Sequence, residues 1–338
     1  MTTTISNPVT FVPRDAPIVP SHIEARRRMM QGLEKELTAL RQLDLGKRLH
    51  EMSFFMGLWV LSATVNYMAY QSPPGYLHTI LRILGTIGTA LAVNTFILFL
   101  HEGMHNTLFS NRFWNRWVSA ALGWVFCISF TAYKVMHTRH HNYLGDPRDP
   151  DDYRNYMKNK RMLWFMHYSR LILGPYLYII VIPLLALRHG SPVERRHVIE
   201  EYAVLLSIYF IAALLVPGNI LLYMWLIPLI ITAHMTAIRG LTQHGITNAQ
   251  DPFIASRSIQ AKPLVAFFLL NENYHLEHHL FPEIPSYNLA QVHQLIWSRL
   301  PHVVTGTSYL AFLFQFFVAS LKMDDKPIGF TDLVEWEV

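Results

Sequence analysis

Eight histidines of this chain lie in three short clusters whose composition and spacing suit metal binding. The clusters span residues 101–105 (HEGMH), 137–141 (HTRHH) and 275–279 (HLEHH). Histidine is the commonest metal ligand among side chains, and its imidazole suits iron, copper and zinc. A catalytic zinc takes about three protein ligands, so three clusters predict two metal ions. The candidate catalytic and metal-binding residues are His101, His105, His137, His140, His141, His275, His278 and His279.

Helical spacing can turn the histidines of each cluster toward one point. Side chains three or four residues apart share a helix face. His101 and His105 have this spacing, and each of the other clusters has one histidine followed by two more at those intervals. Each cluster therefore offers two or three nitrogens in one direction. His244 follows an apolar stretch, and we expect it to be a ninth metal ligand.

Carboxylates accompany the clusters and could orient the histidines. A metal-bound histidine normally donates its second N–H to a carboxylate or a carbonyl. A polar loop broken by prolines explains each loop acid equally well. The acids are Asp146, Asp149, Asp151 and Asp152 after the second cluster, with Glu102 and Glu277 inside the first and third. Most histidines outside the clusters, His293 among them, fit ordinary surface or core positions.

The elements that must position these residues are predicted to be membrane helices. Only 15% of the residues are charged, whereas about 25% is usual for a soluble domain. A spanning helix needs about 20 apolar residues. We therefore predict an all-α integral membrane fold of two transmembrane hairpins, with interfacial or re-entrant helices and a cytoplasmic helical cap that carries the clusters. The four expected spans are Met52–Tyr70, Leu77–Leu100, Ala203–Val216 and Ile220–Ile238.

The distribution of Lys and Arg predicts the orientation. The turns inside both hairpins lack charge, and the positive-inside rule places the basic segments on the cytoplasmic side, together with both termini and all three clusters. Residues 113–132 and Leu171–Leu187 lie between basic segments, so neither should cross the membrane once. We expect both to be interfacial or re-entrant, the second interrupted by Pro175 and Pro183. The basic segments are 21–51, 134–161, 188–201 and 239–262.

The sequence also predicts the domain bounds and limits the possible partners. We expect a disordered tail at 1–20, a membrane domain at 21–310, and a C-terminal interfacial helix and tail at 311–338. The single cysteine, Cys127, excludes a disulfide within the chain and a cysteine-based metal site. The net charge of +5 fits basic loops beside anionic lipid better than a nucleic-acid partner.

Two other functions fit part of the pattern. Residues 101–105 also match the H-E-x-x-H motif of zinc proteases, with Glu102 as the general base of an intramembrane protease. That reading leaves the second and third clusters unexplained. A metal transporter should carry its ligands near the middle of its spans, whereas these clusters lie at span ends and beyond.

The three clusters have the form HxxxH, HxxHH and HxxHH, and the third lies in residues 271–285 (NENYHLEHHLFPEIP). With these motifs the chain resembles the membrane fatty acid desaturases, whose family includes hydroxylases and ketolases. The resemblance covers roughly residues 50–300. It implies that the eight cluster histidines, with His244 as a ninth ligand, bind two iron ions (Fe²⁺/Fe³⁺), and that O₂ is the co-substrate.

The resemblance also implies the reaction and the partners. It favours insertion of a C=C bond into the acyl chain of a lipid, with hydroxylation or ketolation of a carotenoid or other lipid as the alternative. Many members carry a fused cytochrome b5 domain with a His-Pro-Gly-Gly motif, which does not occur here. A separate electron donor of the ferredoxin or cytochrome b5 type is therefore expected. Acyl-CoA desaturases of the family have an asparagine where this chain has Gly240.

Overall fold

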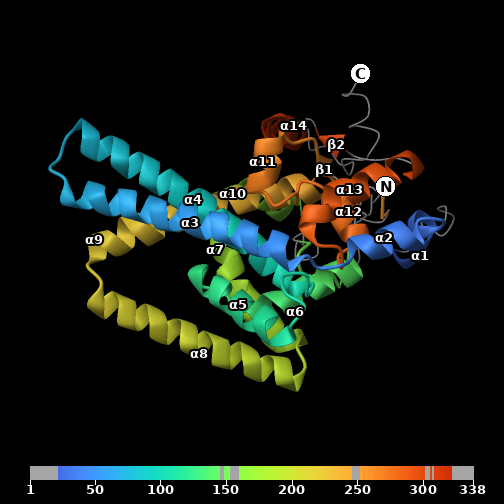
Figure 1. The fold of residues 1–338 in the computed structure, drawn as a ribbon, viewed down its shortest axis with the longest axis horizontal. Helices are drawn as coiled ribbons and strands as arrows, with labels where there is room; N and C mark the ends of the chain where they lie inside the picture. The colour runs from blue at the N-terminus through green and yellow to red at the C-terminus, as the bar shows by residue number, and fades with distance from the viewer. Residues whose placement is uncertain are drawn as a thin grey trace. The chain divides into compact units, whose positions relative to one another are not determined.

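The computed structural model describes residues 22–144, 148–152, 160–245, 252–253, 255–300, 305–306 and 308–321. This part of the chain is almost entirely helical, which confirms the all-α expectation (Figure 1). Two-residue strands β1 (Ser258–Ile259) and β2 (Thr305–Gly306) form one short parallel pair. The tail expected at 1–20 lies outside the described residues.

The chain divides into two compact units, each built from several segments. The first unit comprises Met1–Gln42, Met136–Gly174 and Ala237–Val338. The second unit comprises Leu43–Val135 and Pro175–Thr236. Three helices run from one unit into the other, namely α6 (Phe130–Tyr143), α7 (Lys160–His189) and α10 (Ile227–His244).

The second unit contains the apolar hairpins. Helices α3 (Leu45–Gln71) and α4 (Tyr76–Met104) lie side by side (Figure 1). A Cβ at Gly85 would lie 2.8 Å from Asn66 Cγ, so this glycine lets the two helices approach closely. The unit continues with α5 (Arg112–Val125), α8 (Pro192–Leu215), α9 (Gly218–Leu221) and the π-helical turn η2 (Leu222–Leu226).

Among the described residues, five helical segments are long and apolar enough to cross a membrane. They are Leu45–Gln71, Tyr76–Met104, Leu171–His189, Pro192–Leu215 and Gly218–His244. Four of them match the expected spans, and Leu171–His189 is an additional candidate. Pro175 and Pro183 lie inside α7, so the prediction that they interrupt this stretch was wrong. Proline removes one amide donor, but in an apolar setting the other backbone groups still need their helical partners.

The apolar stretch at 113–132 is broken, as expected of an interfacial or re-entrant piece. Helices α5 and α6 meet at an angle of 99°. Cys127 takes a left-handed conformation in the connecting turn (φ 59°), and Ile128 N donates to Gly123 O at 3.0 Å. Phe113, Trp114 and Trp117 are exposed on α5, as aromatic side chains at a membrane interface are. The side of the membrane on which this piece lies stays a prediction.

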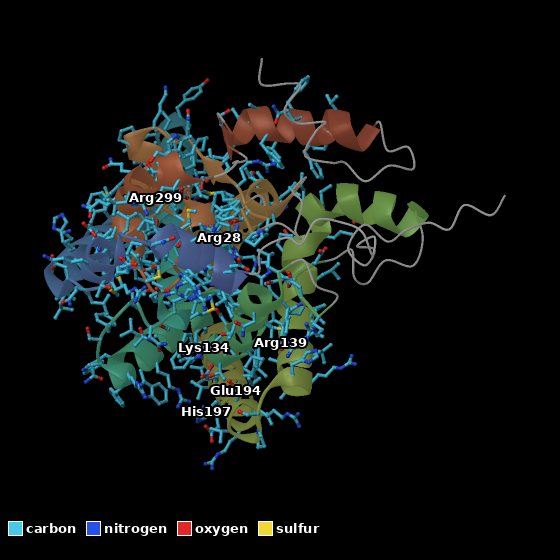
Figure 2. All side chains as sticks on the ribbon, turned by 90° about the vertical axis from the view of Figure 1, so that its right-hand side faces the viewer. Arg28, Lys134, Arg139, Glu194, His197 and Arg299 are labelled. Atoms are coloured by element: carbon cyan, nitrogen blue, oxygen red, sulfur yellow. The ribbon has the colours of Figure 1, made fainter. Side chains whose placement is uncertain are left out.

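The first unit is helical and has its own core. Apolar residues of α1, α2, α12 and α13 pack together, and Asn288 Nδ2 donates to Leu40 O at 2.8 Å. Arg28 of α1 and Arg299 of η4 lie on the surface of this unit (Figure 2). The elements are α1 (His22–Met30), α2 (Glu34–Leu40), α11 (Pro263–Phe268), α12 (His275–Leu280), η3 (Ser286–Asn288), α13 (Leu289–Ile296), η4 (Trp297–Arg299) and α14 (Tyr309–Leu321).

Helix α14 covers the region expected to be a C-terminal interfacial helix. Phe312 and Phe316 are buried against Leu241 at the end of α10, and the Arg257 guanidinium lies 4.7 Å from the Phe312 ring. Leu310 and Phe314 are exposed on the opposite side of the helix. This amphipathic division agrees with an interfacial helix, although the membrane contact itself stays a prediction.

Candidate metal centre

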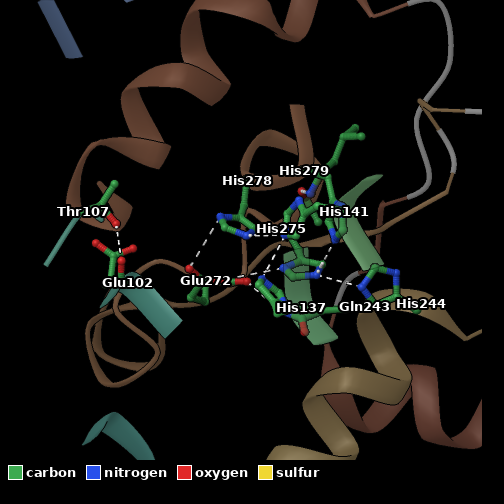
Figure 3. A network of polar contacts seen from close by, with 12 residues as sticks. Glu102, Thr107, His137, His141, Gln243, His244, Glu272, His275, His278 and His279 are labelled. Atoms are coloured by element: carbon green, nitrogen blue, oxygen red, sulfur yellow. Dashed lines mark hydrogen bonds and ion pairs between the residues drawn. The ribbon is translucent and has the colours of Figure 1, made fainter. Parts of the chain in front are cut away.

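Seven of the nine predicted ligands lie in the first unit, on three helices. The second cluster occupies the last turns of α6, the third cluster forms α12, and His244 ends α10. Figure 3 shows these rings turned toward one another. Because i, i+3 and i+4 side chains share a face, two short helical segments supply six of the seven rings.

One group of the first unit joins His140, His244 and His279. One ring nitrogen from each residue lies within 4.8 Å of the others. His275 adjoins the group, with its Nε2 at 2.9 Å from His244 Nε2 and 3.2 Å from His279 Nε2. Ring nitrogens from three separate helices therefore converge, and His244 is among them as expected.

A second group joins His137, His141 and His278, and here too one ring nitrogen from each residue lies within 4.8 Å of the others. His141 Nε2 lies 3.0 Å from His137 Nε2 and 3.2 Å from His278 Nε2. The His141 ring stacks on that of His279 with centroids 4.2 Å apart, so the two groups are neighbours. Two adjacent nitrogen groups support the expectation of two metal ions.

Asp149 orients a histidine of the first group. Its buried carboxylate lies 3.0 Å from His140 Nδ1. Burial lowers the pKa of His140, but the charge and hydrogen bond of Asp149 outweigh it and raise that pKa to about 8. Asp149 therefore holds a proton on Nδ1, so a metal would bind at Nε2 by displacing the second proton that the raised pKa keeps on the ring. Of the four loop acids, Asp149 has the expected role, and Asp146 lies outside the described residues.

Glu272 is a buried partner that the sequence analysis missed. Its Oε2 lies 3.5 Å from His275 Nδ1 and its Oε1 lies 4.0 Å from His278 Nδ1 (Figure 3). Gln243, beside His244, donates its Nε2 to Glu272 O at 2.9 Å. The available signal was the spacing, since Glu272 lies three residues before His275.

The backbone before Glu272 is constrained. Leu270 and Asn271 both have positive φ, at 46° and 59°. A left-handed conformation is uncommon for a bulky residue such as Leu270 and often lies near a functional site. The turn brings Asn271 N within 2.8 Å of Ala266 O and directs the chain into α12.

Glu277 does not have the expected histidine partner in its cluster. Its carboxylate accepts from Ser258 Oγ at 2.5 Å and lies 2.5 Å from His293 Nδ1. Ser258 Oγ in turn accepts from Leu276 N at 3.2 Å, so these contacts fasten α12 to β1 and α13. His293, expected to be an ordinary histidine, instead supports the third cluster from behind.

The first cluster lies in the second unit, at the end of α4. The His101 and His105 rings lie 5.1 Å apart. Asn115 Nδ2 of α5 donates to Gly103 O at 2.8 Å, and a Cβ at Gly103 would overlap with Ser119 Oγ. Glycine between the two histidines therefore allows α5 to lie against this turn. That the first cluster joins the other two at one centre stays a prediction.

Glu102 is held by Arg48 rather than positioned as a base. The buried Arg48 guanidinium pairs with the Glu102 carboxylate, and it also donates to Glu51 at 3.0 Å and to Thr107 O at 3.3 Å. The Glu102 carboxylate oxygen is thus engaged by a buried guanidinium and serves as a structural partner. This pairing argues against the zinc-protease interpretation of residues 101–105.

The donor set suits a transition metal such as iron. Burial and the neighbouring histidines lower the pKa of His279 well below its ordinary value, so its ring is neutral at pH 7. Neutral imidazole is the form that binds iron, and the carboxylates of Asp149 and Glu272 lie behind the rings rather than among the converging nitrogens.

Comparison with known proteins agrees with this geometry. The family model described as fatty acid desaturase matches residues 78–311, which include all three clusters and His244. Sphingolipid delta(4)-desaturase DES1 of Gallus gallus is 28% identical over 234 residues, covering 65% of this chain and 67% of the relative. DES1 of Homo sapiens is 27% identical over 260 residues, covering 69% and 72%. Sphingolipid delta(4)-desaturase/C4-monooxygenase DES2 of Homo sapiens is 26% identical over 238 residues, covering 65% and 67%.

Proposed function

Because the chain belongs to the fatty acid desaturase family, we propose that it is an O₂-dependent, di-iron membrane enzyme that inserts a C=C bond into the acyl chain of a lipid. The observation that carries the proposal is the pair of histidine groups in the first unit, each with three converging nitrogens. The apolar helices supply a membrane setting from which a lipid chain can reach the enzyme.

The nine histidines are proposed to hold the two iron ions. His140, His244 and His279 would bind one ion, and His137, His141 and His278 the other. His101, His105 and His275 are proposed to complete these sites. An iron pair, when bound, supplies the reduction of O₂ and the attack on an unactivated C–H bond, which no side chain can perform.

The protein's own residues fix the geometry for that chemistry. Asp149 keeps the His140 proton on Nδ1, and Glu272 faces the Nδ1 atoms of His275 and His278. Buried carboxylates behind the rings hold their orientation and raise their basicity as ligands. Around the third cluster, Leu276, Leu280 and other buried apolar residues exclude water.

Metal and product analysis test the proposal together. We expect about two iron ions per purified chain and, in a host that expresses the gene, a membrane lipid that has lost two hydrogens. His140→Ala and His278→Ala should lose iron and product while the chain still inserts into membranes. Full iron content in either variant, or one zinc ion per chain in the wild type, would contradict the assignment.

A hydroxylase of the same family is the second candidate. The human relative DES2 carries both activities in its name, delta(4)-desaturase and C4-monooxygenase. Mass spectrometry separates the outcomes, since desaturation removes two hydrogens and hydroxylation adds one oxygen. The relatives favour a sphingolipid-type substrate, and an altered carotenoid pool with unchanged acyl chains would instead identify a carotenoid enzyme.

The electron donor and the orientation complete the proposal. A separate ferredoxin or cytochrome b5-type protein would deliver electrons, and both termini and the three clusters would face the cytoplasm. Membrane fractions of the expression host should form product only after a donor of one of these types and its reductase are added. Product formed by the purified chain with a chemical reductant alone would show that no specific donor is needed.

A further inference from the structure

Arg82 is an isolated charge in the apolar part of the molecule. Residues 52–100 and 202–238 contain no other Asp, Glu, Lys or Arg. These residues supply all of α9 and η2 and most of α3 and α4, whose carboxylates Glu51 and Glu102 lie at the ends of the helices away from Arg82. A charged group among apolar helices is usually paired or functional. Among the described residues of these elements, Arg82 therefore has no carboxylate partner beside it, and an anion from outside them could pair with it.

A pocket of about 490 Å³ opens beside this arginine within the second unit. Its wall includes the polar side chains of Ser72, His78, Asn219 and Tyr223, together with Arg82. Hydroxyl, amide, imidazole and guanidinium groups all can donate hydrogen bonds, and none of the lining residues is acidic. The pocket thus combines one fixed positive charge with several donors, as an anion site requires.

Tyr223 holds the arginine in place. The Arg82 guanidinium lies 4.4 Å from the centre of the Tyr223 ring, a cation–π contact. Tyr223 belongs to η2, the π-helical turn between α9 and α10. A π-helical turn is costly and frequently lies at a functional site. Stacking immobilises the guanidinium plane and leaves its N–H edges for a ligand.

The position of the pocket favours a lipid as the source of the anion. Arg82 and His101 lie on α4, 19 residues apart by their numbers (101 − 82). At about 1.5 Å per residue this is roughly 28 Å, close to the thickness of a bilayer core. The pocket therefore lies at headgroup depth, at the end of the span away from the first cluster. Leu77, Ile80 and Leu84 are exposed on α4 beside it and can contact acyl chains.

We propose that this pocket binds the phosphodiester headgroup of a membrane phospholipid, with Arg82 and Asn219 as its main contacts. The bound headgroup would neutralise Arg82 and connect α4 to α9, the helix that contains Asn219. The lipid site is separate from the histidine groups, so its test does not depend on the proposed enzymatic function.

Native mass spectrometry of the full chain purified in detergent tests the proposal. Phosphatidylglycerol and a diacylglycerol with the same acyl chains are titrated separately, and inorganic phosphate is added as a competitor. We expect phosphatidylglycerol to bind about tenfold more tightly than diacylglycerol, the ratio expected for a charge-assisted hydrogen bond. Phosphate should compete only at much higher concentration. Equal affinity for the two lipids would contradict an anion site in this pocket. If inorganic phosphate competes at the same concentration as phosphatidylglycerol, the ligand is a free phosphate rather than a lipid.

Three variants locate the binding. Arg82→Gln should weaken phosphatidylglycerol binding about tenfold and diacylglycerol binding little. Asn219→Asp has the same size and leaves the stacking of Arg82 intact, so it should fold and still repel the headgroup. Arg196→Gln removes the same charge from an exposed site on α8, where Arg196 pairs with Glu200, and should bind lipid as the wild type does. Unchanged binding in both pocket variants would refute the proposal.

Discussion

At the scale of single residues, the carboxylate behind a histidine decides how firmly that histidine can hold a metal. Asp149→Asn keeps the size of the side chain but removes the charge that stabilises the proton on His140 Nδ1. We expect iron affinity to fall about 10–100-fold, measured as iron retained during dialysis against a chelator. Asp151→Asn is the comparison, since the Asp151 carboxylate acts on His140 only through its charge while its backbone N–H contacts Asp149, so iron retention should fall less. Equal retention in both variants would remove Asp149 from the site.

A second single-residue change tests whether Glu102 in the first cluster is a structural acid or a catalytic one. Glu102→Gln leaves an acceptor for Arg48 but removes the charge, so we expect a loss of about 1–3 kcal/mol in unfolding free energy. Iron content and part of the turnover should persist. Thermal unfolding, metal analysis and product assay measure the three quantities. If the Glu102→Gln variant keeps its metal but loses all catalytic activity, the result would instead support a protease in which Glu102 is the general base.

At the scale of elements, Glu201 of α8 holds the start of α6, the helix that carries the second cluster. Its buried carboxylate accepts from Thr131 N at 2.9 Å, from Thr131 Oγ1 at 2.6 Å and from Ser129 Oγ at 2.7 Å. These contacts satisfy N-terminal donors of the helix that have no partner within it. The geometry of three cluster histidines therefore depends on an acid 60 or more residues away in sequence.

Replacement of Glu201 should disturb α6 and its metal ligands together. Glu201→Ala leaves the buried donors of Ser129 and Thr131 without their acceptor, at a cost of about 2–4 kcal/mol. We expect a lower unfolding temperature and reduced iron content. The neighbouring exposed acid provides the control, because Glu200→Ala breaks only a surface pair with Arg196 and should change neither quantity. A stable, iron-replete Glu201→Ala variant would contradict this role.

Sequence patterns predicted those elements whose signal is local. Uncharged runs of sufficient length identified four apolar spans, and i, i+3, i+4 spacing identified six of the converging rings. The continuity of α7 was not predictable from Pro175 and Pro183, because the cost of each proline depends on its surroundings. Glu272 and the Glu201 contacts were missed because packing, not spacing, brings these acids to their partners.

At the scale of the whole molecule, the first unit constrains how the chain crosses the membrane. His141 of the second cluster and His278 of the third lie 3.2 Å apart, so both clusters are on one side. An even number of crossings must separate them. Within the described part of the chain, three candidate spans lie between them, namely Leu171–His189, Pro192–Leu215 and Gly218–His244. Because the number of crossings is even, at least one of the three does not cross.

The segment Leu171–His189 is the one that we expect to stay on the clusters' side, because basic residues flank it at both ends and the turn between the other two lacks charge. Single cysteines in a Cys127→Ser background test this with an impermeant thiol reagent. Ser191→Cys, after α7, should react from the same side as Gln291→Cys on the exposed surface of α13. Gly218→Cys, in the turn between the two crossing helices, should react only from the opposite side. If Ser191→Cys and Gly218→Cys instead react from the same side, α7 crosses the membrane and α8 does not.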